Sequence, residues 1–501
     1  MTEPEAGARE REVLKARRDS LERLRAAGVE PFAFDFAVTH ATSDVRERHS
    51  TLDPATETED EVSVAGRVVL ARRFGKLVFF TVRDRSGDLQ LFSDEGSMDA
   101  ASFALLDEVD LGDLVGARGR VMTTKKGELS VRVQRLTMLS KALRPLPEKW
   151  HGLKDPDLQQ RYRYLQLATD LDSRHVVEAR AKTLRAFRRV LDERGFVEVE
   201  TPVLHPTAGG AIARPFVTHH RALDVDLYLR IALELYLKRL LVGGLERVYE
   251  IGRNFRNEGI DRDHNPEFTM LEAYQAYGDY ETMMDLGKAL VCGAAEEVRG
   301  SLRFTYQGRE LDLSGEWQKV TVLGSVSDAT GEEVTLDRAD LGAVAERHGI
   351  EVQPTWGPGK IVLELFEELV EGDLWGPVFV CDFPREVSPL ARPHRTSSGV
   401  VEHYDLVIAG MELIPGYSEL SDPDEQRRSF EIQAEAREKG EEETHPLDED
   451  FLQALEHGMP PAGGLGLGVD RLLMILADVP SIRDVIVFPH HRPRTDDPGP
   501  R

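Results

Sequence analysis

The stretch RNFRNEGIDRDHNPEF at residues 253–268 decides how this sequence is interpreted. It crowds arginines, acids, asparagines, a histidine and a proline between two apolar segments, RVYEIGRNFR at 247–256 and EFTMLEAYQAY at 267–277. The composition of both segments is typical of strands, so the pattern predicts an antiparallel pair joined by the loop NEGIDRDHNP. A surface turn requires no such collection of side chains, and we therefore expect this pair to hold a ligand.

The two-residue period of a strand decides which side chains of the pair share a face. A face that combines arginine, glutamate, phenylalanine and tyrosine can clamp a carboxylate or phosphate, stack a flat ring and hold an ammonium. A structural ladder of ion pairs is the alternative. The predicted face consists of Gly252, Asn254 and Arg256 from the first strand and Phe268, Met270, Glu272 and Tyr274 from the second.

A second element is the glycine-rich segment PPAGGLGLGVDRLLMIL at 460–476. It predicts a strand whose backbone can approach a ligand closely, followed by an apolar helix that Asp470 and Arg471 open. An arginine in that place can stack on a nucleobase or pair with a terminal phosphate. The segment contains neither G-K-[ST] nor G-x-G-x-x-G, which disfavours the P-loop and the dinucleotide fingerprint.

A third element is HYDLVIAGMELIPGYSEL at 403–420. If Ala409 and Gly410 form a two-residue hairpin turn, Val407 lies opposite Glu412, and Asp405 becomes the diagonal neighbour of Glu412 on the same face. Two adjacent carboxylates repel each other, and a hard divalent cation such as Mg²⁺ relieves that repulsion. Two exposed acids of a sheet are the alternative.

The whole chain has 501 residues, enough for two or three domains, with 41% hydrophobic and 30% charged residues. Its two cysteines, Cys292 and Cys381, cannot form a disulfide framework, which predicts inert thiols in a reducing compartment. No apolar run is long enough for a membrane span and the N-terminus has no signal-peptide core, so we expect a cytoplasmic protein. The net charge of −26 weighs against nucleic-acid binding, although residues 9–28 are rich in arginine.

Periodicity divides the chain into regions. Residues 8–27 place Val13, Leu21 and Leu24 at helical spacing. From 61 to 140 short alternating segments follow one another, including LSVRV at 129–133, in which Leu129, Val131 and Val133 alternate with Ser130 and Arg132, as in a half-buried strand. About five such strands predict a small closed barrel. A stretch with two prolines, ALRPLPEKWHGLKD at 142–155, marks a boundary before one large α+β region.

Together these elements resemble the class II aminoacyl-tRNA synthetases, and among them the lysyl enzymes of bacterial type. GFVEVETPVL at 195–204 is similar to their first, dimer-forming motif, FRNEGIDRDHNPEFTMLEAY to the second and GLGLGVDRLLMIL to the third. The segments GELSVRV, ARPFVTHHRALDVDLYLRIA, ELYLKRLLVGG and SIRDVIVFP are also similar, and the resemblance extends from about residue 10 to residue 495.

The resemblance implies an α+β fold in which an N-terminal OB-fold β-barrel precedes a class II catalytic domain, an antiparallel sheet flanked by helices. The implied domains are a helical extension at 1–58, an anticodon-binding barrel at 59–142, a linker at 143–160 and the catalytic domain at 161–501. It also implies a homodimer formed through the first motif.

The resemblance also implies roles for individual residues. Arg256 and Arg471 would be catalytic, and Asp405 and Glu412 would hold Mg²⁺. ATP would contact Arg256, Glu258, His264, Phe268, Glu412 and Arg471, with Phe268 stacked on the adenine. Lysine would contact Gly210, Glu234, Arg256, Glu272, Tyr274, Tyr417 and Glu419, with Glu419 and Tyr274 at the side-chain ammonium and Glu234 and Gly210 at the α-amino group. In the barrel, Arg72, Phe79, Gln90 and Glu128 would read a U-rich anticodon, whereas a phenylalanine of the barrel core is the alternative for Phe79.

The chain departs from the family at several places. The usual pocket segment has the form E-I-G-N-G-F-S-E-L, whereas residues 412–420 read ELIPGYSEL. Ile414 and Pro415 replace a glycine and an asparagine that would touch the amino acid, and Leu233 replaces a proline beside Glu234. Asp405 stands where glutamate is more usual. Loss of one hydrogen bond at Pro415 would cost about 1–3 kcal/mol of binding free energy.

The implied function is ATP-dependent activation of L-lysine and its transfer to the 3′ end of tRNA(Lys). One alternative is a synthetase paralogue that delivers lysine or an analogue to a protein or a small molecule. The four anticodon positions of the barrel weigh against it. Another alternative is a catalytically silent RNA-binding relative, which the presence of Arg256 and Arg471 disfavours.

Overall fold

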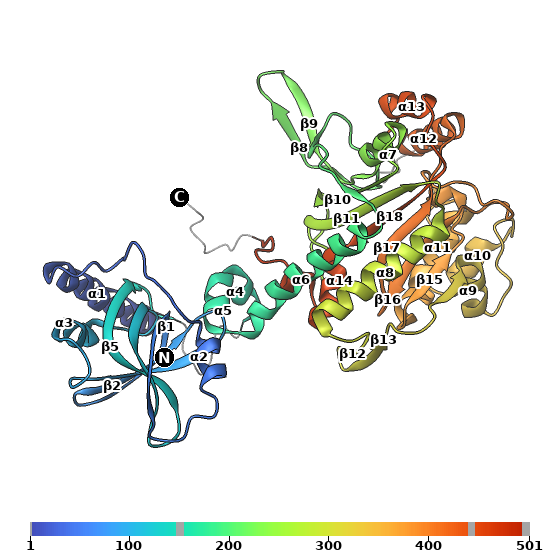
Figure 1. Ribbon diagram of the computed structural model, residues 1–501. Coiled ribbons are helices and arrows are strands. Elements are labelled where there is room, and N and C mark those ends of the chain that lie inside the picture. The colour runs from blue at the N-terminus through green and yellow to red at the C-terminus, as the bar shows by residue number, and fades with distance from the viewer. Residues whose placement is uncertain (1–2, 147–154, 439–445, 493–501) are drawn as a thin grey trace. The chain divides into compact units, whose positions relative to one another are not determined.

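The computed structural model describes residues 3–146, 155–438 and 446–492, in two compact units that divide after Leu171 (Figure 1). The predicted linker at 143–160 includes residues 147–154, which lie outside the described residues. Within the described ranges, no helix has the length and apolarity to cross a membrane. Both cysteines are free, as expected, and burial raises the pKa of the Cys381 thiol to about 12.

The first unit is built on a closed five-stranded barrel, which confirms the predicted barrel. Val78, Phe80 and Val82 of the second strand point into the core, so the alternate residue Phe79 lies on the outer face. Val131 and Val133 of the fifth strand belong to the core, which confirms the predicted alternation, and Ser130 on the other side of that strand is nevertheless fully buried and accepts a hydrogen bond from Gln90 Nε2. The barrel strands, in the order β1-β2-β3-β5-β4, are β1 (Glu57–Phe74), β2 (Leu77–Arg83), β3 (Asp88–Asp94), β5 (Leu129–Ser140) and β4 (Leu114–Thr123).

Helices complete the first unit. The predicted N-terminal helix is present as α1 (Glu3–Ala26), and its residue Leu24 belongs to the barrel core. The other helices of this unit are α2 (Thr42–Arg48), α3 (Ala100–Leu105), α4 (Pro156–Arg161) and α5 (Arg163–Thr169), with the short 3₁₀ turn η1 (Leu106–Glu108).

The second unit is built on an eight-stranded sheet in which all pairs are antiparallel except the two at its edges, β14 with β15 and β10 with β6. This architecture confirms the expected α+β class. The strands, in spatial order, are β14 (Gln318–Thr321), β15 (Val378–Cys381), β16 (His403–Ile408), β17 (Met411–Ser418), β18 (Ala462–Gly468), β11 (Glu267–Ala276), β10 (Arg247–Phe255) and β6 (Val197–Glu198).

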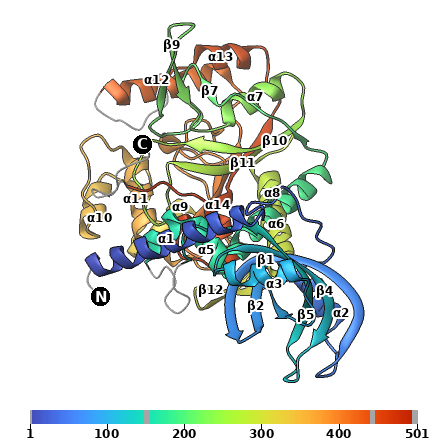
Figure 2. The ribbon, with the colours of Figure 1, turned by 90° about the vertical axis from the view of Figure 1, so that its left-hand side faces the viewer.

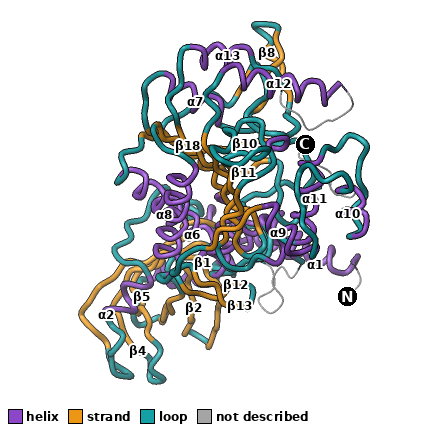
Figure 3. Tube along the Cα trace, turned by 90° about the vertical axis from the view of Figure 1, so that its right-hand side faces the viewer, coloured by secondary structure: helices purple, strands orange, loops and turns teal. Residues whose placement is uncertain are grey.

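Helices α6 (Asp172–Asp192) and α8 (Tyr280–Arg299) lie along one face of this sheet (Figure 3), and α14 (Val469–Ala477) packs against both of them and against β11. Leu271 and Ala273 of β11 point into the core beneath these helices. The alternate residues of β11 therefore point to the opposite face. That face carries the site described below.

The remaining elements surround the open face or extend its edges. Helices α7 (Glu234–Val242) and α13 (Glu449–Glu456) pack together, and α12 (Pro423–Glu438) packs on α13 (Figure 2). Three helices, α9 (Val322–Thr330), α10 (Leu341–Arg347) and α11 (Pro358–Leu369), form a separate apolar core beside β14 and β15. Further elements are β7 (Leu204–His205), β8 (Val217–His220), β9 (Val225–Leu229), β12 (Arg303–Tyr306), β13 (Arg309–Asp312), η2 (Glu371–Asp373), η3 (Arg385–Val387) and α15 (Ile482–Val485).

Candidate active site

The predicted strand pair is present as β10 and β11, and its register confirms the predicted face. Gly252 lies opposite Met270, and Asn254 lies opposite Phe268. Directly opposed residues of an antiparallel pair project to the same side. Arg256 follows the end of β10, where its N–H donates to the main-chain oxygen of Pro266.

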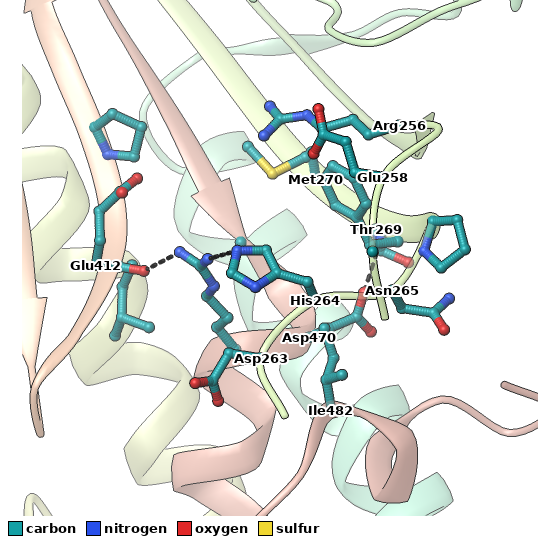
Figure 4. Close-up of a pocket in the computed structure, with 17 residues that line it drawn as sticks. Arg256, Glu258, Asp263, His264, Asn265, Thr269, Met270, Glu412, Asp470 and Ile482 are labelled. Atoms are coloured by element: carbon teal, nitrogen blue, oxygen red, sulfur yellow. Dashed lines mark hydrogen bonds between the residues drawn. The ribbon is translucent and has the colours of Figure 1, made fainter. Parts of the chain in front are cut away.

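A first cavity of about 240 Å³ opens where the β10–β11 loop, β11, β17 and α14 converge (Figure 4). Asp470 connects α14 to β11 and α6 at this cavity. Its Oδ2 accepts the Thr269 N–H at 2.7 Å, and its other oxygen pairs with Arg180. The cavity is lined by Arg256, Glu258, Gly259, Asp263, His264, Asn265, Pro266, Phe268, Thr269, Met270, Glu412, Leu413, Pro415, Gly468, Asp470, Arg471 and Ile482. All six residues expected at ATP line this cavity: Arg256, Glu258, His264, Phe268, Glu412 and Arg471.

Arg471 is held from two sides in this cavity. Its Nη1 donates to the main-chain oxygen of Glu412 at 2.9 Å, and its Nη2 lies 3.0 Å from Nε2 of His264. Asp261 lies 2.9 Å from the other ring nitrogen of His264. The guanidinium is therefore fixed in one orientation at the cavity wall.

A second cavity of about 360 Å³ adjoins the first, and the two share Arg256, Met270, Glu412 and Pro415 as lining residues. Arg256 therefore stands at the junction of the two cavities. Its guanidinium lies 5.2 Å from the centroid of the Phe268 ring. Burial lowers the pKa of Arg256, whereas the charges of Glu258 and Glu412 raise it, and its Nε has no hydrogen-bond partner among the described residues.

The second cavity is lined by carboxylates and tyrosines from several elements. Tyr417 donates its hydroxyl to Glu234 Oε2 at 3.0 Å, and Tyr274 donates its hydroxyl to Glu272 Oε2 at 3.1 Å. Gly210 has φ +88°, and a Cβ there would lie 3.1 Å from the Cβ of Ala232. Of the seven residues expected at lysine, six line this cavity: Gly210, Glu234, Arg256, Glu272, Tyr274 and Tyr417.

The seventh residue, Glu419, is completely buried and does not line the cavity. Its Oε2 pairs with the ammonium of Lys238, which also pairs with Glu234 Oε1 at 2.6 Å. A Cβ on Gly464 would overlap both Glu419 Oε1 and the Tyr274 ring, so the glycine is what admits these two side chains. Burial raises the pKa of Glu419 to about 8, although Lys238 lowers it.

Leu233, which replaces the proline usual in the family, fixes the carboxylate of Glu272. The Leu233 N–H donates to Glu272 Oε1 at 3.0 Å, a contact that a proline in this place could not make. Burial raises the pKa of Glu272 to about 7, and the Leu233 hydrogen bond opposes that rise. Leu233 therefore adds a fixed donor to the pocket.

The predicted hairpin is present, with Ala409 and Gly410 at its turn and Val407 opposite Glu412. The register then shifts at Leu413, an irregularity that the sequence analysis did not foresee. As a consequence Pro415, and not Ile414, lies opposite Asp405.

The shift also corrects the expected position of Ile414. Its side chain is fully buried in the sheet core and faces Gly287 of α8, so it does not touch the second cavity. Pro415, in contrast, lines both cavities, as the sequence comparison with the family segment led us to expect.

Asp405 and Glu412 both line the second cavity. Burial raises the pKa of Glu412, and the charge of Asp405 raises it further. Burial raises the pKa of Glu371 to about 7, and the charges of Glu412 and Asp405 add to that rise. His403 lies 3.1 Å from Asp405 Oδ1. Among the described residues, no group of three or more histidine, cysteine or acidic side chains is arranged to hold a metal ion.

Of the four barrel residues expected at an anticodon, Arg72, Phe79 and Gln90 contact one another on the side of the sheet away from the core, where Gln90 is only 5% exposed. Arg72 Nη2 donates to Gln90 Oε1 at 2.7 Å, and its guanidinium lies 5.6 Å from the centroid of the Phe79 ring. Phe79 also contacts Phe74 and Phe92 edge-on. Because Phe79 points away from the core, the alternative of a core phenylalanine is wrong. Glu128 stands at the start of β5, where its main-chain oxygen accepts from Ser130 Oγ.

The sequence analysis missed Lys238. The signal for it was the four-residue spacing from Glu234 on a predicted helix, which places both side chains on one face. Such pairs are common on exposed helices, so the spacing alone did not distinguish a buried pair.

Two family models match the chain. One, described as tRNA synthetases class II (D, K and N), matches residues 155–492, and one described as OB-fold nucleic acid binding domain matches residues 62–139. The chain is 50% identical to the lysine–tRNA ligase of Moorella thermoacetica, over 97% of this chain and 99% of that protein. It is 47% identical to that of Carboxydothermus hydrogenoformans (96% and 98%) and 48% identical to that of Thermosynechococcus vestitus (98% and 99%).

Proposed function

The chain belongs to the class II tRNA synthetases of the D, K and N group, and on that premise we propose that it activates L-lysine with ATP and transfers it to the 3′ end of tRNA(Lys). The observation that carries the proposal is the position of Arg256 at the junction of the two cavities. A nucleotide in the first cavity and an amino acid in the second would bring their reacting groups together at this guanidinium.

The first step is attack of the lysine carboxylate on the α-phosphorus of ATP, with pyrophosphate as the leaving group. Arg256 would bind the carboxylate and the α-phosphate and offset the negative charge that develops between them. Phe268 would stack on the adenine, and Glu258 and His264 would hold the nucleotide beside it. Arg471, fixed by Glu412 and His264, would bind the γ-phosphate. No protein nucleophile is required, because orientation and charge account for the chemistry.

The second step is attack of the terminal ribose hydroxyl of tRNA on the lysyl-adenylate, which releases AMP. The carboxylates of the second cavity would hold lysine throughout both steps. Glu234 and the Gly210 backbone would bind the α-amino group, and Glu419, Tyr274, Glu272 and Tyr417 would surround the side-chain ammonium. Three of these groups, Glu234, Glu272 and Glu419, are buried carboxylates, whereas, in the part of the chain that the structure describes, the cation in contact with two of them is Lys238 alone. This excess of negative charge supports the assignment, because a buried carboxylate without a cation is costly.

We infer that Mg²⁺ binds beside Asp405 and Glu412. The donor set fits, because hard oxygen ligands suit Mg²⁺ and both carboxylates line the second cavity, which Arg256 also lines. When bound, the cation would neutralise charge on the phosphates of ATP. Asp405, whose side chain is shorter than that of the usual glutamate, would hold the cation from β16, opposite Pro415.

We assign tRNA recognition to the outer face of the barrel. Arg72, Phe79 and Gln90 offer a cation, an aromatic ring and an amide within one contiguous set. Splayed bases of single-stranded RNA are recognised by such stacking and side-chain hydrogen bonds. The positive charge of Arg72 also helps to explain how a chain with a negative net charge could bind a polyanion, since local charge and not net charge decides the contact.

We further propose a homodimer, in the cytoplasm, formed through the first motif. The support is a set of exposed large apolar side chains between residues 197 and 245, where a solvent-facing surface would favour polar ones. These side chains are Val197, Val203, Leu204, Val217, Leu223, Val225 and Leu245. Sedimentation of the whole chain tests the dimer, and a monomer at micromolar concentration would contradict it.

The experiment that tests the function combines two assays. ATP–pyrophosphate exchange, with and without lysine, reports adenylate formation, and charging of tRNA(Lys) reports transfer. We expect both activities. Exchange without charging would favour delivery to another acceptor, and absence of exchange would favour the silent relative.

A further inference from the structure

Lys238 lies at the centre of the carboxylates behind the second cavity. It is completely buried on α7, and its ammonium pairs with Glu234 Oε1 at 2.6 Å and with Glu419 Oε2. It also lies 5.8 Å from the centroid of the Tyr417 ring. The pocket therefore already contains one lysine ammonium, supplied by the protein itself.

The charges around Lys238 do not balance. Glu234, Glu272 and Glu419 are each at most 5% exposed and act on one another electrostatically, and Lys238 is in contact with two of them, Glu234 and Glu419. If all four groups are ionised, three carboxylates and one ammonium leave a net charge of two negative charges. Glu419 Oε1 has no hydrogen-bond partner among the described residues, so an acceptor stays available.

We propose that Lys238 is a positioning residue that sets the charge of the amino-acid pocket, so that the three carboxylates accept two substrate ammonium groups and not three or one. This inference rests on the proposed function. Lysine carries an α-ammonium and a side-chain ammonium, which match the two uncompensated carboxylates, while its carboxylate is bound by Arg256. An amino acid with a single ammonium would leave one buried charge without a partner, which is strongly unfavourable.

A structural role alone explains the observations less well. A single buried ion pair with only a structural role is commonly replaced by apolar side chains without loss of stability. Here the lysine instead divides its ammonium between two carboxylates, Glu234 on α7 and Glu419 directly after β17. The ring of Tyr417 on β17 also faces it, and Glu272 on β11 acts electrostatically on Glu419 without contacting Lys238. Burial alone would lower the pKa of Lys238, and Glu234 and Glu419 raise it above its ordinary value.

The test is a double-mutant cycle between Lys238→Met and Glu272→Gln in the full-length chain. Lys238→Met leaves three carboxylates without their cation, and Glu272→Gln in that background restores a net charge of two negative charges. Glutamine retains an oxygen that can accept the Leu233 N–H. The measured quantity is the KM for lysine in ATP–pyrophosphate exchange, together with the KM for ATP and the Tm of each variant.

If Lys238 sets the charge of the pocket, Glu272→Gln should have opposite effects on the KM for lysine in the two backgrounds. Glu272→Gln should raise the KM for lysine in the wild-type background and lower it in the Lys238→Met background. Lys238→Met alone should raise that KM roughly 10- to 100-fold, since it breaks a buried ion pair. The KM for ATP should change much less, because the first cavity does not contain these residues.

A rise in the KM for lysine on Glu272→Gln in both backgrounds would overturn the proposal and make Lys238 a packing residue. Lys238→Gln provides a second neutral variant if the methionine variant does not fold. Failure of both neutral variants and of the double variant to fold would also overturn it. A wild-type chain without lysine-dependent exchange would instead contradict the proposed function, before any variant is compared.

Discussion

His264 and Arg471 meet at the wall of the first cavity, with Nε2 of the histidine 3.0 Å from Nη2 of the arginine. The histidine comes from the β10–β11 loop and the arginine from the first turn of α14, 207 positions further along the chain. Asp261 holds the far side of the ring. This contact joins two motifs that were recognised separately in the sequence.

Loss of the His264 ring should therefore weaken ATP binding. We expect His264→Ala to raise the KM for ATP roughly 10- to 100-fold, as one hydrogen bond to a charged group is worth roughly 1.5–3 kcal/mol. The KM for lysine should change less. His175→Ala is the matched control, because His175 is an exposed histidine near Glu178 on α6. Equal effects of both substitutions on ATP would contradict the role of His264.

The buried carboxylates predict that lysine binding depends on pH. Burial raises the pKa of Glu272 to about 7 and that of Glu419 to about 8, so both hold protons near neutral pH in the lysine-free protein. An ammonium ligand requires the ionised forms. The KM for lysine should fall at least about tenfold between pH 6 and pH 8, which is the change in the ionised fraction of Glu272 alone. A KM that is constant or rises over this range would contradict the prediction.

The same groups link pH to stability. The ordinary pKa of a glutamate is 4.5, so between about pH 5 and pH 8 the folded protein retains protons that the unfolded chain has released. These two groups therefore make the lysine-free protein less stable as the pH rises through that window. Lysine should raise the Tm more at pH 8 than at pH 6, and thermal unfolding with and without lysine measures the difference.

Pro415 lines both cavities and has neither an amide side chain nor an N–H. We expect Pro415→Asn to lower the KM for lysine about 5- to 10-fold by supplying one hydrogen bond. Ile414 is not substituted in this variant, because its side chain packs in the core against α8. Pro415→Ala is the control and should bring no gain. An equal gain from alanine would show that the ring, and not the missing amide, limits binding.

The barrel prediction separates RNA recognition from adenylate formation. Phe79→Ala and Gln90→Ala should each reduce tRNA charging roughly 10- to 100-fold, since stacking on one base is worth about 1–3 kcal/mol. Lysine-dependent exchange without tRNA should be unaffected. Arg135→Ala, which removes an exposed arginine of β5, is the control. Parallel losses in charging and exchange would indicate that these residues support folding and do not contact RNA.

Local sequence patterns predicted the structure correctly where the pairing of two strands is decided by residues close together in the sequence. The face of β10 and β11 and the turn at Ala409 follow from the two-residue period and from turn geometry. The register shift at Leu413 has no local signal, and it alone moved Ile414 into the core. Lys238 was missed for a related reason, because its burial depends on Glu419, which lies 181 positions away in the sequence.

The central claim is that adenylate formation takes place at Arg256, between the two cavities. The most direct measurement is lysine-dependent ATP–pyrophosphate exchange by Arg256→Ala, with Arg253→Ala as the control. Arg253 lies on β10, three residues before Arg256, and pairs with Glu267 outside both cavities. We predict that exchange falls at least about 1000-fold in Arg256→Ala, in a chain that stays folded, because a charge contact of the transition state is lost. Arg253→Ala should retain wild-type exchange. Exchange by folded Arg256→Ala within tenfold of the wild type would contradict the account.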